Sequence, residues 1–412
     1  MRAESSRSRL LATVCGVTLL AACAHPTSGP PSRGGREPQL RVALVAGAGA
    51  VRVGGEGSVL VEGADNFTLD PGDPIRAVSD GGGVSIEGRP ESHAEQIRVS
   101  SQDGSSFVTI NGQPYRGTIE IYSGSGGVVA VNVVGLEAYL RGVVVTELGN
   151  RSRNELAAME AQAVASRTYA LKNRGRFEAE GYDIRATISD QAYRGVSRES
   201  EVGNAAVART AGLVVTYRGD LASVFYHSTC GYSTASPEEA FRSVRPVAYL
   251  QPVSDRRPSG GYYCDQSPRF RWTVEWEGQE LQDILRRTMP AVLGIDEAVV
   301  DRIYDMYSHG VGPSRRITEL RVSVGNGVIP VFGPDIRRVL ETPEGSMLGS
   351  TAIEVTATRS GDVLDRLRVT GAGWGHGVGM CQWGAIGRAR AGQSAETILT
   401  TYFPGSKIER WY

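Results

Sequence analysis

The pattern of apolar and polar positions changes character near residue 135. From Leu40 to about Val134, short Val/Ile/Leu runs alternate with Gly, Asp, Asn and Ser breaks at intervals of roughly 8 to 15 residues. Such spacing is typical of β-strands joined by turns. We therefore expect residues 39–134 to form a β-rich N-terminal module that serves packing rather than chemistry. The expected strands are Val42–Val45, Val59–Val61, Val84–Ile86, Phe107–Ile110, Thr118–Tyr122 and Val128–Val134.

A helical pattern begins immediately after this module. Apolar residues between Leu136 and Val144 recur at helical spacing, and at about 100° per residue they form one arc. Glu147 falls in the middle of that arc, so the pattern places a carboxylate on the apolar face of the helix. Gly149 follows as the expected helix stop.

Residues 135–412 as a whole predict a mixed core of helices and strands. Ser152-Arg-Asn-Glu155 has the form of a capping box and opens a second helix that runs to about Arg174, packed against the first as a hairpin. Helices and strands then follow without regular βαβ alternation, which indicates an α+β fold. The further expected elements are strands at Leu213–Tyr217, Ala222–Tyr226, Ile317–Val324 and Ala352–Ala357, helices at Glu280–Arg287 and the C-terminus.

The first residues have the features of an export signal. Three arginines precede an apolar run, Leu10–Leu20, which is too short to span a bilayer, since about 20 apolar residues are needed. The run ends in Leu-Ala-Ala-Cys23, which resembles a bacterial lipoprotein signal. We expect residues 1–22 to be removed, Cys23 to carry a lipid, and the Pro/Gly/Ser-rich residues 23–38 to form a flexible tether. An ordinary signal peptide with a chance cysteine is the alternative.

This leader predicts a location outside the cytoplasm, in the cell envelope, with a membrane anchor. Ala24 after the lipidated cysteine is compatible with sorting to the periplasmic face of an outer membrane, if the cell has one. Energy-rich nucleotides are absent there, which favours hydrolytic, lyase or binding functions.

Composition and charge exclude several classes of function. Lys+Arg number 44 and Asp+Glu 45, a net charge of −1, so bulk charge indicates no nucleic-acid partner. The two lysines, Lys172 and Lys407, do not stand in a P-loop context, and the glycines of residues 371–385 do not match the Gly-x-Gly-x-x-Gly dinucleotide fingerprint. Serine-hydrolase and zinc-protease motifs are also absent from the sequence.

Glu147 is the strongest candidate for catalysis. A carboxyl among apolar neighbours loses solvation of its charged form, and near a helix C-terminus it meets the negative end of the helix dipole. Both effects raise the pKa of the carboxyl, as a general acid at neutral pH requires. The alternative is a helix-end glutamate that faces solvent or pairs with an arginine.

Three cysteines remain in the body of the protein, and two of them suggest a metal site. His227 and Cys230 have a spacing compatible with metal binding, and Cys264 could join them. A Cys230–Cys264 disulfide competes in an oxidising compartment. Cys381 would then be a buried free thiol.

Six successive blocks of the chain resemble the SpoIID/LytB family. The resemblance extends from roughly Gln39 to Tyr412. One departure lies directly after Glu147, where Leu148-Gly149 replaces the Met-Pro that is frequent in the family; it changes the helix end and leaves the acid in place. The blocks are YLRGVVVTELG, AQAVASRTYAL (Ala161–Leu171), DQAYRG (Asp190–Gly195), ARTAGLVVTYRG (Ala208–Gly219), YHSTCGYST (Tyr226–Thr234) and GWGHGVGMCQWGA (Gly373–Ala385).

The resemblance implies a role in peptidoglycan remodelling. The family includes a sporulation lytic transglycosylase that acts on glycan strands lacking stem peptides, and Glu147 occupies the place of its catalytic glutamate. A lytic transglycosylase needs one such acid because the 6-hydroxyl of the sugar replaces water, whereas ordinary glycosidases usually need two carboxyls. The family also includes an enhancer of a cell-wall amidase, so a binding protein that assists an amidase without cutting glycan is the alternative.

The resemblance also implies a glycan groove and a possible metal, while the chemistry itself requires no cofactor. Amides, tyrosines and an arginine suit hydroxyl and N-acetyl groups, although each of these side chains can equally be scaffold, and Arg167 can instead pair with Glu155 or Glu160. His376 either lines the groove or satisfies a loop carbonyl. Zinc is described in family members, which supports a structural zinc near His227, Cys230 and Cys264. The substrate-binding candidates are Gln162, Arg167, Tyr169, Gln191, Tyr193 and His376.

Overall fold

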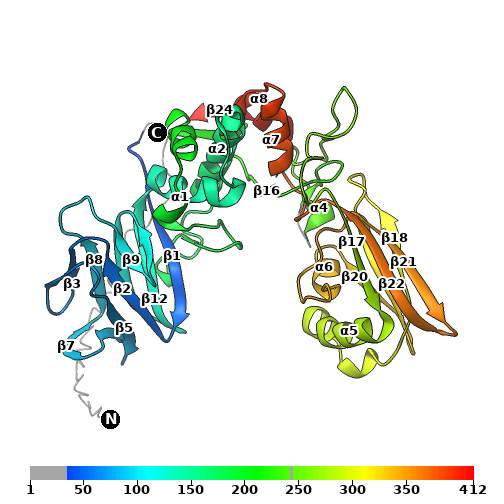
Figure 1. The fold of residues 1–412 in the computed structure, drawn as a ribbon, viewed down its shortest axis with the longest axis horizontal. Coiled ribbons are helices and arrows are strands. Elements are labelled where there is room, and N and C mark those ends of the chain that lie inside the picture. The colour runs from blue at the N-terminus through cyan, green and yellow to red at the C-terminus, as the bar shows by residue number, and fades with distance from the viewer. Residues whose placement is uncertain (1–34, 242–244) are drawn as a thin grey trace, which may run out of the picture.

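The computed structural model describes residues 35–241 and 245–412 (Figure 1). A β-rich module lies at one end, a helical centre follows, and a second lobe of strands and helices lies at the other end. The predicted α+β class is confirmed. The expected signal, Cys23 and most of the tether fall outside the described residues. Within the described ranges, no helix is both long and apolar enough to cross a bilayer.

The N-terminal module consists of two sheets over one core. One sheet has the order β13-β1-β12-β11-β8-β3-β4 and the other β10-β9-β2-β5-β6-β7. Alternate residues such as Ile119 and Ile121 are buried, as half-buried strands require. The strands are β1 Gln39–Ala48, β2 Ala50–Gly55, β3 Val59–Glu62, β4 Phe67–Leu69, β5 Ile75–Asp80, β6 Gly83–Ile86, β7 Arg89–Ala94, β8 Gln96–Ser101, β9 Val108–Ile110, β10 Gln113–Tyr115, β11 Thr118–Gly124, β12 Gly127–Gly135 and β13 Ile184–Arg185.

The two predicted helices are present, joined by a short connection. Helix α1 (Leu136–Leu148) follows β12 directly and ends at Gly149, whose φ of 79° suits glycine. The Ser152–Glu155 capping box is formed and opens a 3₁₀ turn, η1 (Arg153–Glu155), that continues into α2 (Leu156–Lys172). Both helices share one hydrophobic core with the β-rich module.

Around α2, the remaining central elements join distant parts of the chain. They are η2 (Glu178–Glu180), η3 (Gly195–Arg198), α3 (Glu201–Arg209), β14 (Leu213–Tyr217), β15 (Asp220–Leu221), β16 (Tyr226–His227), α4 (Pro237–Ala240), β23 (Met380–Cys381), α7 (Gln382–Arg390), α8 (Ala395–Tyr402) and β24 (Lys407–Arg410). The prediction for β14 is confirmed, but the strand expected at Ala222–Tyr226 is wrong: only two-residue strands flank it, and β16 pairs in parallel with β23.

The second lobe has a hydrophobic core of its own. Its two three-stranded sheets have the orders β17-β22-β21 and β18-β19-β20, and Trp276, Leu285 and Leu320 lie in the core. The predicted helix at Glu280–Arg287 is part of a longer helix. The elements are β17 Arg271–Glu277, α5 Gly278–Leu293, η4 Glu297–Val299, β18 Ile303–Val311, β19 Ile317–Val324, β20 Gly327–Phe332, α6 Asp335–Val339, β21 Ile353–Ser360 and β22 Val363–Ala372.

Both ends of this lobe leave the central part at one point. Arg271 at the start of β17 is paired with Ala372 at the end of β22. Just beyond Ala372, Gly373 and Trp374 return to the centre, where Trp374 pairs with Thr229 through two backbone hydrogen bonds of 2.7 and 3.0 Å. The second lobe is therefore an insertion between two neighbouring strands of the central part.

Candidate active site

Glu147 opens onto a cavity of about 430 Å³ at the centre of the molecule. The walls come from segments that are far apart in the sequence, and they combine polar groups with an apolar surface. Ile188, 92% exposed, forms part of the rim. The lining residues are Glu147, Tyr169, Ile188, Ser189, Asp190, Phe225, Tyr226, His227, Ser228, Phe241, Trp374, His376 and Gln382.

The carboxyl of Glu147 is held in a defined position at the end of α1. Its Oε1 accepts a hydrogen bond of 2.8 Å from the backbone N–H of Ala192. Burial raises the pKa of Glu147 above its usual value, while hydrogen bonds from Ala192, Gln382 and Tyr226 oppose this rise. The net shift favours the protonated form, which can donate a proton to a bound molecule.

A second carboxyl, Asp190, lines the same cavity and was not singled out by the sequence analysis. Its Oδ1 accepts from the Tyr169 hydroxyl at 2.9 Å and from Arg176 at 2.8 Å. Its Oδ2 accepts from the backbone N–H of Arg185 at 3.0 Å. Both oxygens of Asp190 are engaged by donors, so this carboxyl positions Tyr169.

Gln191 and Gln162 lie behind the cavity wall and are fully buried. Gln191 accepts from Tyr139 at 3.1 Å and donates to the Tyr226 hydroxyl at 3.0 Å. Gln162 accepts from Gln382 at 3.3 Å. The two amides thus orient Tyr226 and Gln382, the two side chains that hydrogen-bond to Glu147.

Tyr193 and Arg167, two other sequence candidates, are not among the residues that line the cavity. The Tyr193 hydroxyl donates to Asn132 at 3.0 Å, and the ring packs against Tyr139 with centroids 4.7 Å apart. The guanidinium of Arg167 is fully buried and donates twice to Glu137, at 2.8 and 2.6 Å. Both side chains serve the core.

The expected alternative partners of Arg167 are wrong. Glu155 pairs with Arg390 and Glu160 pairs with Arg209 at 2.7 Å. Glu137 on α1, which the helical pattern places off the apolar arc, is the partner of Arg167 instead.

His376 lines the cavity and also binds a loop carbonyl, so both alternatives for this residue apply. Its Nδ1 accepts from the N–H of Val378 at 3.1 Å, so Nε2 carries the hydrogen and donates to the Tyr226 carbonyl at 3.0 Å. Burial and the charge of neighbouring groups lower the pKa of His376 to about 3, and the pKa of His227 is lowered likewise to about 3. Both imidazoles are therefore neutral at physiological pH.

A larger cavity of about 750 Å³ adjoins this site at Ser189, which lines both. It lies between β1, the β11–β12 hairpin and the turn around η2. The smaller cavity contains Glu147, His227 and His376, none of which lines the larger one.

The glycines of the loop after β22 allow its backbone to approach the centre. Gly373 has a φ of 77°, and a Cβ at this position would stand 2.5 Å from the carbonyl oxygen of Thr229. Only glycine therefore fits at position 373.

We predict that Gly373→Ala lowers the free energy of unfolding by about 1–3 kcal/mol and moves Trp374 in the cavity wall. Chemical denaturation with tryptophan fluorescence measures both effects. Gly49→Ala is the control, because a Cβ at Gly49 would meet nothing within 4 Å. Equal stability of the two variants would contradict the prediction.

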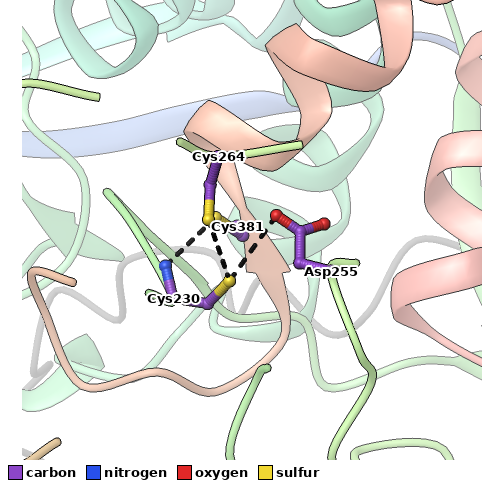
Figure 2. Close-up of side chains that lie close together, drawn as sticks. All are labelled: Cys230, Asp255, Cys264 and Cys381. Atoms are coloured by element: carbon purple, nitrogen blue, oxygen red, sulfur yellow. Dashed lines mark hydrogen bonds between the residues drawn. The ribbon is translucent and has the colours of Figure 1, made fainter. Parts of the chain in front are cut away.

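Two of the predicted metal ligands lie together, with two further residues. Cys230, Asp255, Cys264 and Cys381, here called the cysteine cluster, place one ligand atom each within 4.8 Å of one another, and all four are buried (Figure 2). The cluster could hold a structural metal ion. All three cysteines are free thiols, with Sγ of Cys230 and Cys264 3.5 Å apart. His227 is not one of the four; its Nδ1 lies 3.2 Å from the carbonyl of Val378.

Comparison with known proteins assigns the central part to a family. Residues 124–217, which include α1 and Glu147, match the SpoIID family, described as stage II sporulation protein. Residues 244–379, which include the second lobe, match a domain of unknown function, DUF8618.

Related proteins extend over most of the chain. An uncharacterized protein of Brachyspira hyodysenteriae is 28% identical over 77% of this chain and 77% of its own length. The amidase enhancer of Bacillus subtilis is 26% identical over 84% of this chain, which spans about half (51%) of that protein. Stage II sporulation protein D of Bacillus subtilis is 26% identical over 79% of this chain and 87% of its own length. Residues 124–217, which carry α1, α2 and Glu147, are therefore the part of the chain that matches the SpoIID family.

Proposed function

We propose that this protein is a lytic transglycosylase that cleaves the glycan strands of peptidoglycan, with Glu147 as the catalytic residue. The observation that carries the proposal is a carboxyl that lines a central cavity and whose burial raises its pKa. A group of this kind keeps its proton to a higher pH than an exposed glutamate, as a general acid for a glycosidic oxygen requires.

The proposed reaction uses the Glu147 carboxyl twice, first as an acid and then as a base. The Glu147 carboxyl donates its proton to the oxygen that links C1 of N-acetylmuramic acid to N-acetylglucosamine, and the C1–O bond breaks. The carboxylate then accepts the proton of the muramic 6-hydroxyl as its oxygen bonds to C1. The products are a free 4-hydroxyl on N-acetylglucosamine and a 1,6-anhydro-muramic end, and Glu147 is protonated again.

The other walls of the cavity suit a sugar chain. The rings of Trp374, Phe225 and Phe241 offer apolar faces, against which pyranose rings pack, and the hydroxyl of Tyr169 is fixed by Asp190. The neutral His376 is occupied at both nitrogens. His227 also lines the cavity, but its pKa is lowered to about 3, so Glu147 is the side chain we assign as the proton donor.

The second candidate function is that of a peptidoglycan-binding enhancer of a cell-wall amidase. The amidase enhancer of Bacillus subtilis aligns with 84% of this chain, more than stage II sporulation protein D does. In this case the same cavity would bind glycan, and the partner would be an amidase.

Both functions require a location in the cell envelope. The leader and Cys23 support export and a lipid anchor to the membrane, with the described part of the chain facing the wall outside the cytoplasm. Glycan strands, either intact or stripped of stem peptides, would be the ligand.

The deciding experiment is product analysis after incubation of the protein with intact and with peptide-stripped peptidoglycan. Mass spectrometry detects 1,6-anhydro-muramic ends, each 18 Da lighter than a hydrolytic end because no water is added. Anhydro ends support the transglycosylase, and the substrate that yields them shows whether stem peptides must be absent. Strands that are bound but remain intact would contradict it and favour the enhancer.

The pH dependence of cleavage provides a separate prediction. Because the acid must be protonated, the rate is expected to fall as the pH rises through the pKa of Glu147, which lies above its usual value. His376 and His227, with pKa values of about 3, are neutral throughout this range. Initial cleavage rates on peptide-stripped glycan between pH 4 and pH 9 measure this fall in rate. A rate that rises through this range would contradict the assignment.

A further inference from the structure

The cysteine cluster joins three segments of chain that are far apart in sequence. Cys230 follows β16, Asp255 and Cys264 lie in the loop before β17, and Cys381 lies at the N-terminus of α7. Figure 2 shows the four side chains pointing toward one another. Their ligand atoms meet in the interior, where the fully buried carboxyl of Asp255 lies among three thiols and needs polar partners or a metal ion.

Two separations within the cluster are close to those expected for tetrahedral coordination of zinc. With Zn–S bonds of about 2.3 Å and Zn–O bonds of about 2.0 Å, two sulfurs stand about 3.8 Å apart and a sulfur and an oxygen about 3.5 Å apart. Sγ of Cys230 lies 3.5 Å from Sγ of Cys264 and 3.6 Å from Oδ2 of Asp255. These two pairs are therefore close to the spacing in a tetrahedral zinc site, and all four ligand atoms lie within 4.8 Å of one another.

The groups around the cluster orient its ligands. The hydroxyl of Tyr402 donates to Oδ1 of Asp255 at 2.7 Å, and Arg388 donates to the same oxygen at 3.2 Å. Oδ2, the oxygen near Cys230, remains available for a metal. Such outer hydrogen bonds fix a ligating carboxylate and partly balance the negative charge of the ligands.

Backbone N–H groups support the third sulfur. Sγ of Cys381 accepts hydrogen bonds of 3.2 Å from the N–H of Cys230 and of 3.2 Å from the N–H of Gly384. Cys381 is also the N-cap of α7, so the positive end of that helix faces its sulfur. Both features favour a thiolate, the form that binds metal.

We propose that Cys230, Asp255, Cys264 and Cys381 bind one structural zinc ion. Three thiolates and a carboxylate complete a tetrahedral set with no position left for water, which is the arrangement of a structural rather than a catalytic site. Thiolate ligands select zinc over magnesium or calcium. Binding releases three thiol protons, and the four negative ligands and Zn²⁺ leave a charge of −2 beside Arg388.

The position of this site connects it to the cavity. Gln382, which hydrogen-bonds to Glu147, follows the ligand Cys381 directly, and His227 precedes Cys230 by three residues. The ligands Asp255 and Cys264 hold the loop that leads into the second lobe. Zinc would therefore fasten the base of that lobe to the loops that build the cavity wall.

The test is the metal content and thiol state of the full chain, exported by its own leader, solubilised with detergent and purified without chelators. Mass spectrometry of the metal is expected to give about one zinc per chain. Alkylation of the denatured protein without reductant is expected to label all three of Cys230, Cys264 and Cys381. A chain free of stoichiometric metal, with two of these cysteines protected as a disulfide, would overturn the proposal.

Variants separate the proposed ligand set from the set that includes His227. Asp255→Asn is expected to lower bound zinc at least tenfold under mild chelation, whereas His227→Asn is expected to retain it. Loss of zinc from His227→Asn with retention in Asp255→Asn would overturn the assignment. If Asp255→Asn does not fold, the metal content and the alkylation pattern of the wild-type chain still test the zinc proposal.

A stability measurement on the wild-type chain is independent of any variant. A chelator such as 1,10-phenanthroline is expected to lower its melting temperature by about 5 °C or more, and added zinc to restore it. Hydrogen exchange is expected to rise on chelation in residues 227–232 and 373–384. An unchanged melting temperature after proven removal of zinc would contradict a structural role, whatever the activity of the protein on glycan.

Discussion

Glu147→Gln is expected to reduce the release of anhydro-muramic ends by about 10²–10⁴-fold, the contribution typical of a general acid. Glutamine retains the shape of the side chain and can still accept from the N–H of Ala192, a bond of 2.8 Å in the wild type. It has no proton to donate to a leaving oxygen. Product analysis on peptide-stripped glycan measures the loss, and a pull-down with insoluble peptidoglycan is expected to show unchanged binding.

The matched control is Glu280→Gln on α5, an exposed glutamate in the second lobe that has no contact with the cavity. Glu280→Gln is expected to cleave at the wild-type rate. Full cleavage by Glu147→Gln would contradict the assignment of the acid. A wild-type protein that binds glycan but releases nothing would instead favour the amidase enhancer, and the variant would then test binding alone.

Stability measurements separate a chemical effect of Glu147→Gln from a folding defect. The pKa of Glu147 is raised in the folded state, so between the unfolded and folded pKa values the folded chain binds more protons than the unfolded chain. Stability from this group is therefore present at low pH and lost as the pH rises through the folded pKa. At neutral pH the glutamine variant is expected to be at least as stable as the wild type.

Arg167→Met is expected to lower the free energy of unfolding by about 3–5 kcal/mol, the usual cost of removing one partner of a buried ion pair. The Arg167 guanidinium is fully buried, and its two bonds to Glu137 join α2 to the start of α1. Glu137 also accepts from the N–H of Gly212 and the hydroxyl of Tyr412. Without Arg167, this carboxylate stays largely enclosed with no opposite charge.

Urea denaturation measures this effect, and Arg209→Met provides the control. Arg209 on α3 pairs with Glu160 on α2, but its side chain is 66% exposed, so its loss is expected to cost about 1 kcal/mol or less. The double variant Glu137→Gln/Arg167→Met is expected to recover part of the stability, because no unpaired charge remains. Equal effects of Arg167→Met and Arg209→Met would contradict a structural role for Arg167.

The local parts of this structure could be predicted from the sequence. Helix α1, the Ser152–Glu155 capping box and strand β19 follow from periodicity and from signals within a few residues. Strand β17 was missed, although its sequence RWTVEWE alternates the apolar residues Trp272, Val274 and Trp276 with polar ones, as a half-buried strand does. The sequence pattern did not show that the lobe containing β17 has a hydrophobic core separate from that of the centre.

The parts of the site that depend on distant partners could not be predicted. Asp190 reaches the cavity because its oxygens are held by Tyr169 and Arg176, which no local pattern shows. The sequence suggested Glu155 and Glu160 as partners of Arg167. The packing of α1 against α2 places Glu137 next to it instead. Cys381 lies 151 residues after Cys230, so only the parallel pairing of β16 with β23 brings it to the cluster.

The pairing of Arg271 with Ala372 bears on how this architecture can vary over evolutionary time. A lobe whose entry and exit are neighbouring residues can lengthen, shorten or be exchanged without changing the path of the rest of the chain. The glutamate on α1 and the surface of the second lobe can therefore be selected independently. Diversity among related chains is expected to concentrate in this lobe, where new binding preferences can arise while the cavity around Glu147 stays the same.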